Sequence, residues 1–358
     1  MAMRSGTELH PDKVCSARSW ERRVVIQNVT HQRLRRVFVA AAILSTALTG
    51  CVHPRSEAPD PLRVFGMRMT IERGPVNVAA QHFQPGPIPV GHGGIPNLFA
   101  LPGSTPPLEP ADLATHAETQ ALRNSLAHPD LRIVLTVAEG HYRLLGRRSA
   151  GIATLADLRG KRIATVDDTS AAFHLHKMLR LAGLTEADVT IVPFPRPTGI
   201  ARAIIDRSVD VLAMWEPEMQ SAVEALGDDA ILFDQDPGYR EIFNLNTTAG
   251  KLADPAKRAQ IVAFVAATIA ASRTLIRDPS EGIRLVGEAS GYDPALVARS
   301  WRHHSFPGRI SPDLLDILVE EEAWMAARAG RAPRGRAELA TLIDTSVVTE
   351  ALALVAEK

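Results

Sequence analysis

The chain has 358 residues, with 40 basic and 40 acidic side chains, and 46% of its residues are hydrophobic. It is therefore long enough for one large core or for two lobes of ordinary domain size. Residues 1–50 are basic, so residues 51–358 carry a net charge of about −5, which argues against nucleic acid as a partner.

The first element is a short apolar segment, Val37–Leu48, which follows a cluster of arginines. Its length fits the roughly 7–15 residues of a signal-peptide core and falls short of the ~20 residues that span a bilayer. The segment ends in Leu48-Thr49-Gly50-Cys51, which resembles the lipobox of bacterial lipoproteins. We expect residues 1–50 to be a lipoprotein signal peptide, Cys51 to carry the lipid, and residues 51–61, with three prolines, to be a tether.

Two readings of this region stay open. The apolar segment would also suit a buried core helix, and the long, mixed-charge stretch before it would suit a later translation start near Val25, Val29 or Leu34. Cys51 is the only cysteine after the leader, since Cys15 lies within it. The rest of the chain therefore has no internal disulfide, thiolate metal site or cysteine nucleophile.

The middle of the chain alternates short β-rich runs with amphipathic segments, a pattern typical of α/β units around a mainly parallel sheet. The predicted strands are Leu62–Gly66, Arg132–Ala138, Arg162–Val166, Val189–Val192 and Val209–Met214. Helices are predicted at Ser170–Ala182 and Gly199–Arg207, which gives each crossover the length of a βαβ unit.

The last third of the chain is predicted to be almost entirely helical. A polar residue followed by proline marks four helix starts: Asp254-Pro255, Asp278-Pro279, Asp293-Pro294 and Ser311-Pro312. The polar side chain caps a free backbone N–H, and proline suits the first helical position because its missing N–H is not needed there.

An ordered series of motifs in the middle of the chain resembles a known family. The series is Asp157-Leu-Arg-Gly-Lys-Arg-Ile163, Leu179-Arg-Leu-Ala-Gly-Leu184, Asp188-Val189, Val209-Asp210 and Trp215-Glu-Pro217. It is similar to the periplasmic substrate-binding proteins of ABC importers, in the nitrate, sulfonate, taurine and thiamine-pyrimidine group. About a fifth of the chain carries the resemblance strongly.

The resemblance implies a type II periplasmic-binding fold, in which two α/β lobes joined by two crossovers close on a ligand. Lobe 1 would hold residues 62–150 and 247–358, and lobe 2 would hold residues 151–246. The hinges would lie near Ser149–Ile152 and Phe243–Thr248. The ligand would then lie between the lobes, where strand ends and helix N-termini meet.

The segment that opens the helix Ser170–Ala182 is the best candidate for ligand contact. Helix N-termini offer free N–H groups, so Thr169 and Ser170 would hold a sulfonate, carboxylate or nitrate oxygen. Asp167 and Asp168 stand there in place of the family's glycine turn and would disfavour an anion unless they point away. Thr169 also reads as a simple helix cap, and His174, one turn later, reads as a structural histidine or as a hydrogen-bond donor to ligand.

Further candidates follow the other strands. The family places the Trp215-Glu216 turn at the cleft, although Trp215 would also serve as a buried core residue. Thr115 and Glu118 precede or open a helix of lobe 1, and Glu139 and Tyr142 follow Arg132–Ala138. The first strand is followed by two more rim candidates, Thr70 and Glu72.

If these assignments hold, four glutamates surround the cleft: Glu72, Glu118, Glu139 and Glu216. That many carboxylates favour a zwitterion or an amino-heterocycle over nitrate, unless the individual glutamates cap helices or face solvent. No catalytic residue, cofactor or metal is expected. His303-His304 and the pair His174 and His176 lack the i, i+4 spacing of a helical metal site, and neither a P-loop nor a Gly-x-Ser-x-Gly elbow is present.

The sequence thus predicts a monomeric lipoprotein on the extracytoplasmic or periplasmic face of the cell envelope. It would be a substrate-binding protein, not an enzyme, that delivers a small polar organic solute to the transmembrane subunits of an ABC permease. Two alternatives stay open. One is an enzyme related to the pyrimidine-precursor synthases of this fold, whose cysteine-rich motif this chain lacks, and the other is a ligand-sensing lipoprotein without a transport role.

Overall fold

The computed structural model describes residues 60–99, 109–197 and 199–356. The chain divides into two units, residues 1–58 and 59–358, and the description concerns the second. The predicted signal peptide, the tether residues up to 59 and the anchor Cys51 lie outside the described residues.

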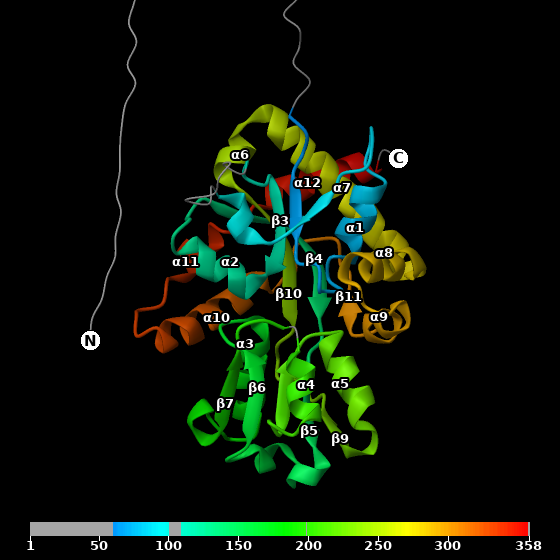
Figure 1. The fold of residues 1–358 in the computed structure, drawn as a ribbon. Coiled ribbons are helices and arrows are strands. Elements are labelled where there is room, and N and C mark those ends of the chain that lie inside the picture. Colours follow the sequence, from blue (N-terminus) through cyan, green and yellow to red (C-terminus); the bar gives the residue numbers. More distant parts are fainter. Residues whose placement is uncertain (1–59, 100–108, 198, 357–358) are drawn as a thin grey trace, which may run out of the picture. The chain divides into compact units, whose positions relative to one another are not determined.

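The described residues form two β-sheets, each covered by helices (Figure 1). In order, the first sheet contains β11 (His304–Ser305), β4 (Leu131–Gly140), β10 (Glu241–Thr248), β3 (Leu113–Ala117), β1 (Val64–Gly66) and β2 (Val90–His92). The second contains β7 (Thr190–Phe194), β6 (Arg162–Val166), β8 (Val211–Met214), β5 (Arg143–Arg147) and β9 (Ala230–Phe233). The sequence predicted this two-lobed α/β architecture.

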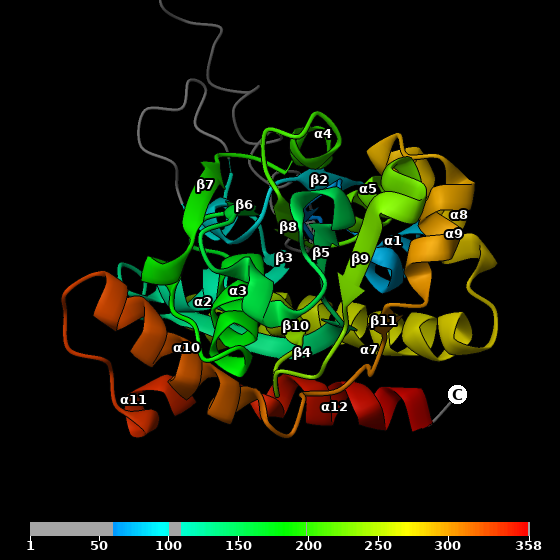
Figure 2. The same ribbon diagram turned by 90° about the horizontal axis from the view of Figure 1, so that it is seen from below.

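Nine of the α-helices among the described residues accompany the first sheet: α1 (Gly74–Gln81), α2 (Glu118–Ser125), α6 (Ala249–Ala253), α7 (Pro255–Arg277), α8 (Ser280–Ser290), α9 (Pro294–Trp301), α10 (Leu314–Arg328), α11 (Arg336–Ala340) and α12 (Thr345–Ala356). Three accompany the second: α3 (Ser170–Leu181), α4 (Ile200–Ile205) and α5 (Glu218–Leu226). Figure 2 shows α7 and α12 running along one side of β4 and β10.

Both sheets are mixed, whereas the sequence predicted mainly parallel ones. In the first sheet β1 is parallel to β2 and β3, but β10 is antiparallel to β3 and β4. In the second, β6 is parallel to β7 and β8, but β5 is antiparallel to β8 and β9. The antiparallel strands are those that enter or leave a lobe, and they lack the βαβ pattern that a sequence reading detects.

The chain passes between the sheets at other points than the sequence indicated. β4 leads to β5 through His141 and Tyr142 alone, and β9 leads to β10 through residues 234–240. The expected hinges, Ser149–Ile152 and Phe243–Thr248, lie after β5 and within β10, because these two strands belong to opposite sheets from those assumed. We therefore propose lobe boundaries at the two observed connections.

Helix capping in the last third follows the predicted chemistry at Asp254 and Asp293, whereas α8 begins at Ser280, after Pro279 and not at it. Asp254 Oδ1 accepts from the backbone N of Ala256 and of Lys257, and Asp293 Oδ1 accepts from that of Ala295. Asp278 Oδ1 accepts from the backbone N of Ser280, the first residue of α8. Ser311 does not cap α10; its hydroxyl donates instead to Glu139 (2.6 Å), which draws the residue away from the helix.

Among the described residues, α7 is the one helix long and apolar enough to cross a membrane. More than half of its most apolar stretch is buried in this structure, where it packs against α1 and α12. Its apolar character therefore has an explanation as the central helix of the first lobe.

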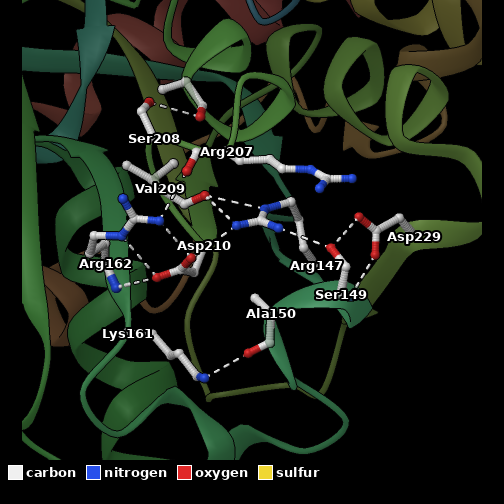
Figure 3. Close-up of polar contacts among 11 residues, drawn as sticks. Arg147, Ser149, Ala150, Lys161, Arg162, Arg207, Ser208, Val209, Asp210 and Asp229 are labelled. Atoms are coloured by element: carbon white, nitrogen blue, oxygen red, sulfur yellow. Dashed lines mark hydrogen bonds and ion pairs between the residues drawn. The ribbon is translucent and has the colours of Figure 1, made fainter.

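Two family-like motifs meet in a polar network at one end of the second sheet (Figure 3). Asp210, just before β8, accepts from the guanidinium groups of Arg147 and Arg162, with both Nη2–Oδ1 distances 2.9 Å. The backbone N of Arg162 also donates to Asp210 Oδ2 (3.0 Å), and Lys161 Nζ donates to the carbonyl of Ala150 (2.7 Å). Because β6 and β8 begin here, these motifs join the strands at the edge opposite to their carboxyl ends.

Candidate functional site

A small cavity lies at the carboxyl ends of β6 and β8, between the two sheets. Its volume is about 30 Å³, enough for about one or two water molecules. Residues from both lobes line it: Met67, Thr70, Glu72, His116, Ala117, Thr119, Gln120, Thr169, Ser170, Trp215, Glu241 and Phe243. A solute larger than water therefore enters only if the lobes separate or the lining side chains move.

A chain of hydrogen bonds crosses the cavity wall from one lobe to the other. Ser170, the first residue of α3, donates its hydroxyl to Glu241 Oε1 of β10 (3.2 Å). Tyr142, in the two-residue connection, lies 3.0 Å from the Ser170 hydroxyl oxygen. Ser170 begins a helix, Glu241 begins a strand, and Tyr142 lies where the chain passes from one sheet to the other. The three side chains therefore meet where the two lobes come together.

Glu72 and Glu241 are a buried carboxyl pair on this cavity. Glu72 is 1% exposed and Glu241 is 4% exposed. Burial raises the pKa of Glu241 well above its usual value, and the negative charges of Glu72 and Glu118 raise it further. Burial alone would also raise the pKa of Glu72, but the charge and hydrogen bond of His304 lower it. The pKa of Glu72 is therefore lowered and that of Glu241 is raised, and Oε2 of each side chain has no hydrogen-bond partner among the described residues.

Five of the predicted site residues line the cavity: Thr70, Glu72, Thr169, Ser170 and Trp215. Tyr142 reaches it through Ser170. Their contact with a ligand stays a prediction. The Thr169 hydroxyl donates to the carbonyl of Val166 (2.6 Å), so its side chain closes the turn before α3 and does not cap the helix.

Three predicted glutamates do not line the cavity, because each already has partners in the protein. Glu118 accepts from the hydroxyl of Tyr239 (2.6 Å) and from the backbone N of Ile242 (2.9 Å). Glu139 forms an ion pair with Arg240 (2.8 Å). Glu216 forms an ion pair with Arg143. These carboxylates stabilise the lobes and their connections.

Thr115 and His174 are also absent from the cavity wall. Thr115 is fully buried and packs over Gly66 of β1, where a Cβ on the glycine would lie 2.6 Å from the threonine hydroxyl. His174 is 1% exposed and meets the Tyr142 ring edge-on, with centroids 5.6 Å apart. Burial lowers the pKa of His174 to about 4, so its ring is neutral and supports Tyr142 from behind.

Sequence reasoning missed four polar lining residues: His116, Thr119, Gln120 and Glu241. The helix α2 begins at Glu118, so the residues that follow it face the cavity while Glu118 turns inward. Glu241 opens a fully buried strand whose polar and apolar residues alternate after Pro237-Gly238. That alternation was the available signal for a strand, but its position on the cavity depends on tertiary structure.

The acidic turn before α3 points away from the cavity toward cations of the first lobe. Arg328 of α10 lies 2.6 Å from Asp167 Oδ1 and 3.0 Å from Glu186 Oε2. Gln120 and Arg123 of α2 donate to the backbone carbonyl of Asp168, at 3.0 Å and 3.3 Å. Asp168 adopts a left-handed backbone (φ 53°), the conformation that a glycine would take more easily. These contacts join the two lobes at the cavity rim.

The part of the chain that the structure describes contains no group of three or more His, Asp or Glu side chains arranged to hold a metal ion.

Comparisons with known proteins agree with this architecture. Residues 107–282 match the model of the family described as NMT1/THI5 like. No curated protein matches the chain. The alkanesulfonate-binding protein SsuA from Xanthomonas axonopodis pv. citri, solved with MOPS, is 22% identical, with a TM-score of 0.61 over 81% of this chain and 100% of its own.

Two other solved structures broaden the comparison. The periplasmic nitrate-binding protein NrtA from Synechocystis PCC 6803 is 11% identical, with a TM-score of 0.63 over 82% of this chain and 88% of its own. The desulfurization enzyme DszB is 14% identical, with a TM-score of 0.59 over 82% of this chain and 99% of its own. The chain thus carries an NMT1/THI5-like domain in residues 107–282 and has the two-lobed fold of the periplasmic binding proteins.

Proposed function

We propose that the protein is an extracytoplasmic solute-binding lipoprotein of an ABC importer, which captures a small polar organic solute between its lobes and presents it to the permease. The observation that carries this proposal is the cavity between Glu72, Ser170, Trp215 and Glu241, lined from both lobes. Its contents determine how the lobes meet, so a solute that contacts both sides stabilises closure.

The lining favours a polar solute, either a taurine-like sulfonate or an amino-heterocycle. Glu72, Glu241 and Thr70 supply carboxyl and hydroxyl groups, while Trp215 and Phe243 supply aromatic surface. Cys51 would hold the protein at the membrane near its permease, and the two recognition surfaces would be the outer faces of the lobes.

The described cavity offers few side chains that suit the enzyme alternative. The fold also occurs in DszB, an enzyme. The cysteines of this chain, Cys15 and Cys51, both lie outside the described residues and therefore outside the described cavity. The buried His174 and His116 have pKa values lowered to about 4 by burial, which suits neutral hydrogen bonding more than proton transfer at neutral pH. A sensory role would use the same cavity.

A thermal-shift panel with the full chain tests the proposal, using alkanesulfonates, taurine, nitrate, pyrimidines and amino acids. A ligand at about 100 times its Kd stabilises by about 2.7 kcal/mol, which should raise the Tm by about 5–10 °C. Trp215→Ala should remove the response while the protein remains folded. A folded sample that responds to none of these compounds would contradict solute binding.

Unchanged ligand mass after binding, and unchanged protein mass at its histidines, would separate a binder from a synthase. Loss of solute uptake on gene deletion would separate a transport receptor from a sensor.

A further inference from the structure

The described residues that line the cavity include two carboxyl groups but no arginine or lysine. The guanidinium groups of Arg73 and Arg143 have partners elsewhere. Arg73 donates to Asn77 Oδ1 (2.8 Å) and to the Gly66 carbonyl (3.1 Å), and Arg143 is paired with Glu216. An anionic ligand group placed beside Glu72 and Glu241 would therefore meet negative charge without a compensating side-chain cation.

Glu72 and Glu241 each have one carboxyl oxygen without a hydrogen-bond partner among the described residues. Glu72 Oε1 receives the His304 Nε2 contact (3.2 Å) and Glu241 Oε1 receives the Ser170 hydroxyl, which leaves Oε2 on each side chain. Neither Oε2 has a hydrogen-bond partner among the described residues.

Two donors on the same wall are independently unpaired. Trp215 is 8% exposed, and its Nε1 has no acceptor among the described residues. Thr119 is fully buried, and its hydroxyl likewise has no partner there. A buried donor without an acceptor is unfavourable, so a ligand that supplies an acceptor atom is favoured. The cavity thus offers unpaired carboxyl oxygens together with unpaired neutral donors.

We infer that Glu72 and Glu241 hold the positively charged group of the solute, and that Trp215 and Thr119 serve its hydrogen-bond acceptor. This inference rests on the proposed solute-binding function and narrows it to small zwitterions and protonated amino compounds. A cation between the carboxyl groups contacts oxygens that have no other hydrogen-bond partner, and the Trp215 indole adds an aromatic surface that attracts cations.

Further acidic side chains surround this pair. Burial and then the charges of Glu72 and Glu118 raise the pKa of Glu241, and burial also raises the pKa of Glu118 of α2 and of Glu321 of α10. Tyr142 and Tyr239 are neutral, because burial raises the pKa of each phenol well above 10. His304 Nε2 lies 3.2 Å from Glu72 Oε1, and the charge and hydrogen bond of Glu72 raise the pKa of His304 against the opposing effect of burial.

Isothermal titration of the full chain with matched probes tests the inference. Taurine and isethionate differ by an ammonium in place of a hydroxyl, and 4-aminopyridine and pyridine differ by a positive charge at neutral pH. In at least one pair, the member with the additional cationic group should bind about tenfold or more tightly than its partner without that group, equivalent to about 1.4 kcal/mol.

Glu241→Gln should reduce the affinity for that cationic probe by about tenfold, while the affinity for its partner without the cationic group stays unchanged. Glutamine is nearly isosteric with the protonated carboxyl of Glu241, so folding should be preserved. Glu338→Gln, at an exposed glutamate of α11, is the matched control and should change neither affinity.

The outcomes separate the two proposals. Isethionate and pyridine binding as tightly as taurine and 4-aminopyridine would overturn the charge assignment and leave solute binding intact. A folded protein that binds none of the four, and none of the thermal-shift panel, would overturn both. If Glu241→Gln fails to fold, the wild-type comparison decides, and Glu72→Gln repeats the variant test from the other carboxyl group.

Discussion

Asp210 shows how a motif residue supports the site without touching it. Its carboxylate receives Arg147 from β5 and Arg162 from β6, at the end of the second sheet remote from the cavity. The Arg162 hydrogen bond is the main cause of the lowered pKa of Asp210, so the carboxylate is ionised at neutral pH. The part of the sequence most like the family thus holds three strands in register.

Replacing this carboxylate should lower stability and leave binding unchanged. Asp210→Asn leaves the Arg147 guanidinium, which is only 6% exposed, without its ion pair. We expect the free energy of unfolding in urea to fall by about 2 kcal/mol, with unchanged ligand affinity. Asp228→Asn, at an exposed neighbouring site, should change neither quantity. A loss of affinity in a stable Asp210→Asn protein would contradict the purely structural role.

The Glu72–His304 pair gives stability a defined dependence on pH. Burial lowers the pKa of His304, but the charge and hydrogen bond of Glu72 outweigh burial and raise it above 6.5. A histidine whose pKa is higher in the folded state contributes full stability below its unfolded pKa and loses it as pH rises through the folded one.

Urea unfolding between about pH 6 and pH 9 measures this effect, because stability should fall through that window in the wild type. In His304→Gln the free energy of unfolding should no longer fall across this pH range. In His82→Gln, at an exposed pair with Glu281, it should fall as in the wild type. A flat wild-type profile would show that the pair is not ionised.

At the scale of elements, α10 joins the lobes. Arg328 contacts Asp167 and Glu186, Trp324 Nε1 donates to Glu186 (3.0 Å), and Phe173 of α3 packs 5.3 Å from the Trp324 ring. These contacts connect the first lobe to the start of α3 and to the turn after it. These contacts stabilise the closed arrangement of the lobes. Because ligand binds between closed lobes, they also increase the affinity for ligand.

Arg328→Ala should therefore weaken ligand binding even though Arg328 does not line the cavity. Two partly exposed ion pairs contribute about 1 kcal/mol to closure, so we expect about a fivefold increase in Kd, measured by titration. Arg336→Ala removes a pair with Asp316 inside the first lobe and should leave Kd unchanged. Equal effects of the two variants would contradict a role in closure.

Local patterns predicted the elements better than they predicted the cavity. Arg162–Val166 was predicted with its observed bounds because β propensity and flanking turns agree there, and Asp254 caps α7 through chemistry contained in three residues. Glu241 and Thr119 face the cavity through the pairing of β10 with β3 and β4, which no local pattern records. Glu118 is the opposite case. It lies at the start of a helix, as predicted, but its carboxyl group accepts a hydrogen bond inside the lobe.

At the scale of the whole molecule, the proposed anchor and the cavity are independent. Cys51 lies outside the described residues, and the cavity uses residues from Met67 onward. Cys51→Ala should move the protein from the membrane fraction to the soluble envelope fraction, with unchanged ligand affinity. Immunoblotting of the fractions and titration of the released protein measure the two effects. A variant that stays with the membrane would contradict lipidation at Cys51.

The unequal links between the lobes determine how the molecule opens. His141 and Tyr142 form one link, and the backbone N of His141 is bonded to the carbonyl of His303 (2.9 Å). Two residues supply only about four soft dihedral angles, whereas the return through residues 234–240 has far more freedom. We therefore expect the short link to act as the pivot of any opening and the long one to follow. A pivot of so few dihedral angles would confine the motion of the lobes to few directions, and the environment of the Tyr142 ring should then change with the angle between them.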